Sequence, residues 1–255
     1  MNPNNYLLDK IMNERNGTEY RCPQDDRVLL CEMMKEINTN LGTDFRYIAE
    51  IDACDISGSG RIMVGYFNRF QSESVRAYLI PQIVSDQVPR CEEIIFLGYL
   101  HFKQSDEYIS EVGKPAPAHI YVRYDNAFRR LKPRRLKTEL FNLISNPRDA
   151  FYLPLTTRML ASWKLSGLEC VLISYMNGAK YEDAGLPNDT EGYFPPLHFI
   201  NRELCFTAID ALKYYVSEAN LSVIKKYIDS PDKDIANAAR KSFDYMKKKD
   251  GIKGD

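Results

Sequence analysis

The chain has 255 residues, enough to bury a large hydrophobic core as one extended domain or as two compact ones. Its 34 lysine and arginine residues balance its 35 aspartate and glutamate residues, which excludes a general attraction to nucleic acid or to a membrane surface. The six cysteines include no C-x-x-C pair, and no stretch approaches the ~18 apolar residues of a membrane span. We therefore expect a cytoplasmic protein with reduced thiols that does not bind membranes.

The first part of the chain is expected to form short helices. Apolar residues recur at helical spacing in 5–15 and in 25–41, and Gly42 after the second segment is a typical helix C-cap. Segment 44–55 also has helical spacing, although a strand over 45–53 fits its pattern as well.

The next elements are also expected to be helical. Segment 57–60 reads Ser-Gly-Ser-Gly and predicts a turn between two helices, with Ser59 as the N-cap of the second. Ser72 is a suitable N-cap for another helix, which Pro81 would kink. Segment 91–103 is the most apolar of the chain, and its length and neighbours favour a central helix over a buried strand.

A linker candidate follows at 113–117, where the sequence Gly-Lys-Pro-Ala-Pro breaks regular structure. We predict a single helical-repeat domain over 1–255. If the chain is subdivided, this linker would separate 1–112 from 118–255.

The second half continues the helical pattern. Apolar residues in 121–131 lie on one helical face, and Pro133 ends that helix. Segment 177–196 is rich in turn-forming residues and predicts a long irregular loop, of the kind that often carries a binding surface in repeat proteins. Between Pro133 and this loop, three further helices are predicted, at 134–145, 155–164 and 168–176.

The region from Leu204 to Lys249 contains two copies of one pattern, and each position of the second copy lies 31 residues after its counterpart. The first copy is Leu204, Ala208, Ala211, Leu212 and Tyr215. The second copy is Ile235, Ala239, Ser242, Phe243 and Met246. Small residues in both copies indicate that the two helices approach each other closely.

The second copy resembles the second helix of a HEAT repeat of the short bacterial kind. Ser230 can serve as its N-cap, Pro231 fits the first turn, and Asp232 and Asp234 favour the positive helix start. Ala236 stands where the family usually has an arginine, so the match is incomplete. The resemblance implies an all-α fold, an α-solenoid of HEAT-like helix pairs. The alternative is an α+β part over the first ~110 residues, followed by a helical-repeat C-terminal half.

A basic run with interleaved aromatic residues is the clearest candidate for binding. Its arginines could bind phosphates or an acidic protein surface. Alternatively, the run could form a solvated convex face. The candidate binding residues are Arg123, Tyr124, Asp125, Arg129, Arg130, Arg134 and Arg135.

The other chemically active residue types form no recognisable site. The three histidines lack metal-ligand spacing; we expect His101 in the core and His198 at the surface. No serine or cysteine stands in a nucleophile motif. We therefore expect no metal, no cofactor and no enzymatic activity.

Two functions remain. The leading hypothesis is a non-enzymatic helical-repeat scaffold that binds another protein; an inhibitor or immunity protein would be one kind. The alternative is a DNA-binding or alkylated-DNA repair protein, because one family of bacterial alkylpurine DNA glycosylases is built on HEAT-like repeats. That resemblance would make Asp125, beside Arg123 and Tyr124, the candidate aspartate of a basic groove. The balanced net charge and the single tryptophan speak against it.

Overall fold

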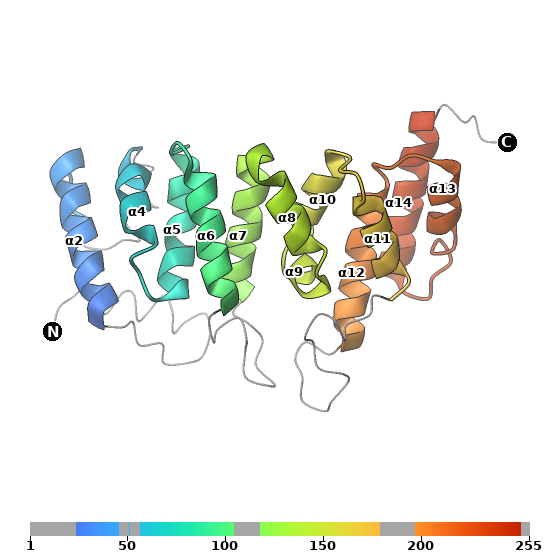
Figure 1. Cartoon of the computed structure of the whole chain (residues 1–255), viewed down its shortest axis with the longest axis horizontal. Helices are drawn as coiled ribbons and strands as arrows, with labels where there is room; N and C mark the ends of the chain where they lie inside the picture. Colours follow the sequence, from blue (N-terminus) through green and yellow to red (C-terminus); the bar gives the residue numbers. More distant parts are fainter. Residues whose placement is uncertain (1–23, 46–50, 52–56, 105–117, 179–196, 251–255) are drawn as a thin grey trace. The chain divides into compact units, whose positions relative to one another are not determined.

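The computed structural model of the chain describes residues 24–45, 51, 57–104, 118–178 and 197–250 (Figure 1). All regular secondary structure in these residues is helical, with no strand, so the all-α prediction is confirmed for them. The strand alternative for 91–103 is wrong. The predicted helix at 5–15, the linker candidate and most of the segments 44–55 and 177–196 lie outside the described residues.

The described helices divide into two compact units, with the boundary between Leu131 and Lys132. The subdivision predicted at 112/118 falls in residues that the structure does not describe. The first unit contains α2 (Gln24–Leu41), α4 (Ser59–Phe67), α5 (Glu73–Ser85), α6 (Cys91–Gln104) and α7 (Ala118–Leu131). The second contains the 3-10 helix η1 (Arg134–Leu136) and the helices α8 (Lys137–Ile144), α9 (Pro147–Tyr152), α10 (Pro154–Ser162), α11 (Leu168–Met176), α12 (Leu197–Leu212), α13 (Glu218–Lys225) and α14 (Lys233–Asp250).

Helix α5 lies at the centre of the first unit. Ten of its 13 residues are buried, and it contacts α4, α6 and α7. Its start is as predicted, because the Ser72 hydroxyl accepts the backbone N–H of Val75 at 3.3 Å. The loop before α5 is held by α2. The buried Asp26 carboxylate of α2 accepts the backbone N–H groups of Gln71 and Ser72 at 2.8 and 2.7 Å.

An aromatic cluster joins α6 and α7 in an antiparallel pair. Tyr124 stacks on Phe102 with ring centroids 5.9 Å apart, while Phe128 contacts Tyr99 at 6.0 Å. Gly98 allows close packing here, since a Cβ there would come within 2.5 Å of the Phe67 ring of α4 and 3.1 Å of the Tyr124 hydroxyl. The most apolar segment of the chain is therefore a core helix, as its length predicted.

The N-terminus of α4 is capped differently from the prediction. Gly58, in a left-handed conformation, occupies the N-cap position, and Ser59 is the first helical residue. The acceptor comes from the end of α5: the Asp86 carboxylate takes the backbone N–H groups of Gly58 and Gly60 at 2.9 and 2.6 Å. An acidic side chain at a helix N-terminus also complements the helix dipole.

The repeated pattern at the end of the second unit lies along buried faces. Helices α12 and α14 pack together, and the small residues Ala208, Ala211, Ala239 and Ser242 are buried. The neighbouring helices α11 and α13 are joined by a polar contact, in which Asn220 donates to the Glu169 carboxylate at 2.7 Å. The short helix α9 is an addition to the predicted elements, and η1 precedes α8 where one longer helix was expected.

Candidate functional site

The predicted basic run is divided between the two units. Arg129 and Arg130 are exposed at the C-terminal end of α7 in the first unit, whereas Arg134 and Arg135 are exposed in η1 of the second. Arg123, one turn from the start of α7, is half-buried. The two arginine groups therefore belong to different units.

Two of the predicted binding residues lie in the core. Tyr124 is fully buried in the aromatic cluster, and Asp125 is only 3% exposed. The helical period explains this, since both positions share the inward face of α7 with Phe128. Tyr124 and Asp125 therefore do not lie on the surface that exposes Arg129. The prediction that the whole run forms one binding surface is wrong for these two residues.

Arg134 packs against the single tryptophan of the chain. Its guanidinium lies 5.6 Å from the centroid of the Trp163 ring, within the range of a cation–π interaction. This contact orients Arg134 along the end of α10.

A cleft with a volume of about 540 Å³ opens in the first unit, between the α5–α6 turn and the end of α7. Arg90 of the turn and Arg130 of α7 both line it, together with Glu92 of α6 and the apolar residues Val88 and Leu131. Of the predicted site residues, Arg130 is the one that lies in this cleft.

Arg90 has an unusual backbone. Its φ of 62° is in the left-handed region, where a residue with a side chain is disfavoured. Its guanidinium donates to a single oxygen of Glu93, with Nη2 at 2.6 Å and Nε at 3.1 Å. The hydrogen bond with Glu93 raises the pKa of Arg90 above its ordinary value.

A second polar group lies where α5 begins and α6 ends. Glu73 and Arg76 form an ion pair in which both side chains are 1% exposed. The Nδ1 atom of His101 lies 2.8 Å from Glu73 Oε1 and 2.7 Å from Arg76 Nη2. Burial raises the pKa of Glu73, although Arg76 and His101 act in the opposite direction.

His101 was expected in the core, and that prediction is wrong. Its side chain is 60% exposed and covers the buried ion pair from outside. The apolar neighbours that suggested burial occupy the other face of α6. A histidine held by a carboxylate can transfer protons. The lining of the cleft, however, does not include it.

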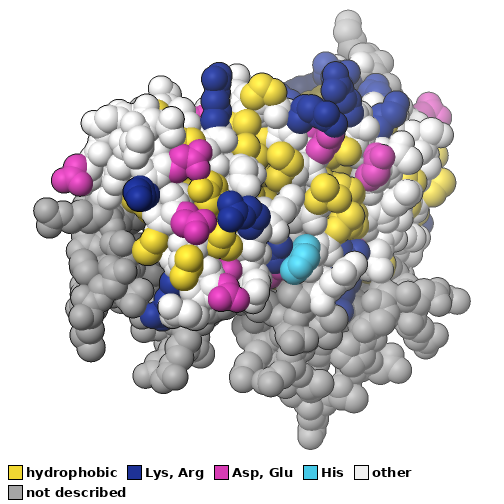
Figure 2. All heavy atoms as spheres, turned by 60° about the vertical axis from the view of Figure 1, so that its left-hand side comes forward, with side chains coloured by type: hydrophobic (Ala, Val, Ile, Leu, Met, Phe, Trp, Pro, Cys, Tyr) yellow, Lys and Arg dark blue, Asp and Glu magenta, His cyan; other side chains and the backbone are white. Residues whose placement is uncertain are grey.

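The outward face of α6 carries a row of residues spaced four apart: Glu93, Leu97 and His101. Leu97 is 56% exposed, the highest value among the exposed large hydrophobic residues of the described chain. Figure 2 turns the α2 side of the chain forward and shows hydrophobic side chains lying among acidic and basic ones on that face. Leu97 is therefore an exposed apolar side chain between two polar ones on this face.

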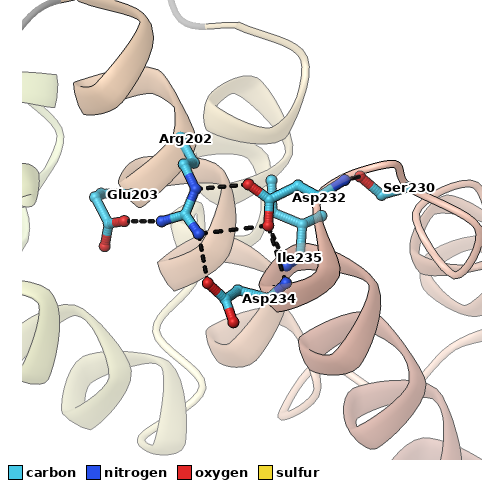
Figure 3. A network of polar contacts seen from close by, with 6 residues as sticks. All are labelled: Arg202, Glu203, Ser230, Asp232, Asp234 and Ile235. Atoms are coloured by element: carbon cyan, nitrogen blue, oxygen red, sulfur yellow. Dashed lines mark hydrogen bonds and ion pairs between the residues drawn. The ribbon is translucent and has the colours of Figure 1, made fainter.

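The second unit contains an extended polar network around Arg202 of α12 (Figure 3). Arg202 donates to Asp232 at 2.6 Å and to Asp234 at 2.5 Å, and it also pairs with Glu203. Asp232 in turn accepts the backbone N–H groups of Asp234 and Ile235 at 2.9 and 3.2 Å.

This network corrects the predicted start of α14. The helix begins at Lys233, so Asp232 is its N-cap, and Ser230 instead accepts the backbone N–H of Asp232 at 3.3 Å. The hydrogen bond from Arg202 lowers the pKa of Asp232. The network therefore ties the start of α14 to α12.

No cluster of three or more metal-ligating side chains occurs within the described residues. His198 is exposed, as predicted. Among the described helices, none combines the length and the apolar character that crossing a bilayer requires.

The cleft and the outward face of α6 were not predicted from the sequence. The cleft joins residues about 40 positions apart, and Leu97 belongs to a segment that was interpreted only as core.

The chain matches no family model, no curated protein and no solved structure in comparisons with known proteins.

Proposed function

We propose that the protein is a non-enzymatic scaffold of HEAT-like helix pairs that binds another protein. Support comes from the order of helix contacts within each unit. In the first unit α4 packs on α5 and α6 on α7, and these pairs stack through contacts of α4 with α6 and of α5 with α7. In the second, α11 packs on α12 and α13 on α14, with α12 against α14. Repeat proteins stack in this way and bind partners through the outward faces.

The observation that carries the proposal is the outward face of α6. Leu97 is more than half exposed, although the opposite side of the same helix supplies Tyr99 and Phe102 to the core. The opposite face of α6 is buried without Leu97, which leaves the leucine available for contact with a partner. Its position between Glu93 and His101 suits a small apolar contact with a polar rim.

The test is site-specific photo-crosslinking in the native cell, with a photoreactive amino acid in place of Leu97. Lys241, exposed on α14 of the second unit, is the control position. The proposal predicts a defined protein adduct at position 97 that is absent at 241. If position 97 gives no protein adduct, or if both positions give the same products, the scaffold proposal fails.

The nucleic-acid alternative is supported by the exposure of four arginines, Arg129, Arg130, Arg134 and Arg135. Against its glycosylase form stands the burial of Asp125, which in this position cannot reach a nucleotide. Binding of fluorescent DNA and RNA at low and moderate salt tests the alternative, with the four arginines changed to glutamate as the control. Salt-sensitive binding that the charge reversal abolishes would favour it over the scaffold.

A further inference from the structure

A group of exposed cations lies in the second unit, where η1 meets the end of α10. The two elements are in contact there, because the guanidinium of Arg134 lies over the Trp163 ring. Five basic side chains belong to these elements or directly flank them, and none forms an ion pair with a described residue. Glu139, the acidic residue closest to them in sequence, is exposed and pairs with none of them. We call these five residues the η1 patch: Lys132, Arg134, Arg135, Lys137 and Lys164.

Three of these cations lie at the start of a helix. Lys137 is the first residue of α8, and Arg134 and Arg135 lie in the 3-10 turn just before it. The start of a helix carries a positive partial charge, and no side chain caps the start of α8. The cations and the helix end therefore repel each other. A carboxylate bound beside them would relieve that repulsion.

Trp163 positions one guanidinium of the η1 patch. Arg134 lies 5.6 Å from the centroid of its ring, so the partner of Arg134 within the chain is an aromatic ring rather than a carboxylate. The planar guanidinium recognises oxyanions through paired N–H donors. Because stacking already orients Arg134, less side-chain entropy is lost when it binds such a group. The donors of Arg134 are thus oriented and available to a ligand.

The small extent of the η1 patch favours an acidic protein segment over nucleic acid. Nucleic-acid strands bind along extended basic grooves, whereas these cations are confined to η1, its two flanking residues and one turn. The whole chain, with 34 basic and 35 acidic residues, adds no general attraction for a polyanion. We propose that the η1 patch binds a short run of aspartate or glutamate residues in the protein partner. This inference rests on the proposed scaffold function, which makes the ligand a protein.

The test is a titration of the full chain with a fluorescein-labelled hexaglutamate peptide. Fluorescence anisotropy gives the affinity, and the NMR signal of the Trp163 indole N–H gives the location. That signal needs no further assignment, because the chain has one tryptophan. The comparison ligands, at equal ionic strength, are the hexaglutamine peptide and a single-stranded oligonucleotide of equal charge. We expect hexaglutamate to shift the indole signal and to bind about tenfold more tightly than either comparison ligand.

Two lysines of the η1 patch can be removed without harm to the fold. Lys132 and Lys164 have left-handed backbones, with φ of 49° and 55°, which glycine adopts without steric cost. The double variant Lys132→Gly/Lys164→Gly should bind hexaglutamate about tenfold more weakly, with the unfolding midpoint unchanged or raised. Gln87→Gly controls for the backbone change, since Gln87 has a φ of 48° and no charge. Lys241→Gln/Lys248→Gln, on exposed positions of α14, controls for the loss of two charges. Both controls should keep the wild-type affinity.

Several results would overturn the inference. Equal or tighter binding of the oligonucleotide would make the η1 patch a nucleic-acid site, and equal binding of hexaglutamine would leave no role for charge. An equal loss of affinity in Lys241→Gln/Lys248→Gln would indicate diffuse attraction. Binding that leaves the indole signal unmoved would place the peptide elsewhere, and absence of binding would also overturn the inference. The crosslink at position 97 tests the scaffold separately. A crosslink without peptide binding would refute the η1 patch alone, whereas a missing crosslink would refute the scaffold even if hexaglutamate binds.

Discussion

Two glycines of α4 should respond to alanine in opposite directions. At Gly60 a Cβ would lie 2.8 Å from the backbone oxygen of Gln82 and 2.8 Å from Asp86 Oδ2. The backbone oxygen cannot rotate away, so the helix end must shift and weaken the bond from the Gly60 N–H to Asp86. At Gly65, exposed on the same helix, a Cβ meets nothing within 4 Å.

The magnitudes follow from these contacts. Alanine in place of glycine gains about 1 kcal/mol inside a helix. Overpacking costs about 1–3 kcal/mol, and a hydrogen bond to a charged group contributes about 1.5–3 kcal/mol. We expect Gly60→Ala to lower the free energy of unfolding by about 2–4 kcal/mol and Gly65→Ala to raise it by up to about 1 kcal/mol.

The assay is urea unfolding followed by far-ultraviolet circular dichroism, with hydrogen exchange of α4 and α5 amides to locate the change. Both variants keep the net charge and the helix, so Gly65→Ala controls for helix propensity. If both substitutions stabilise the chain equally, the close contact between the start of α4 and the end of α5 does not exist as described.

Three further predictions concern polar groups. Arg76→Met should cost about 3–5 kcal/mol in urea titrations because it strands the buried Glu73 carboxylate, and adding Glu73→Gln should recover most of that loss; an equally unstable double variant would refute this. Burial raises the pKa of Tyr215 to about 12. The stability that the neutral phenol contributes is therefore complete below about pH 10 and is lost as the pH rises toward 12. Tyr215→Phe should remove this part of the decline in the free energy of unfolding, and an unchanged pH profile in the variant would exclude a contribution from Tyr215. Asp232→Ala should lower the melting temperature more than Asp234→Ala, since Asp232 caps α14 and binds the arginine of Figure 3; equal losses by calorimetry would contradict this.

Local patterns were sufficient to predict most of the described helices. The segments that became α2, α5 and α11 show apolar spacing and end signals that depend on their own residues, such as the Ser72 cap and Gly42 with a φ of 65°. The six residues of α9 were missed because so short a helix has too few positions to show a period.

Features made by distant residues could not be predicted in the same way. Asp86 caps a helix that starts 27 positions earlier, and Ser59 was the plausible local candidate. His101 was assigned to the core from its apolar neighbours, because the sequence did not show which side of α6 faces the buried Glu73 and Arg76. The basic run likewise could not show that α7 turns Tyr124 inward.

The most direct measurement of the scaffold claim is the affinity of the crosslinked partner for the purified chain, wild type beside Leu97→Asp, by isothermal titration calorimetry. Leu97 is exposed, so the substitution should leave the unfolding midpoint unchanged. The affinity should fall about tenfold or more, which corresponds to about 1.4 kcal/mol. Equal affinity for the two folded proteins would contradict the claim that the outward face of α6 binds the partner.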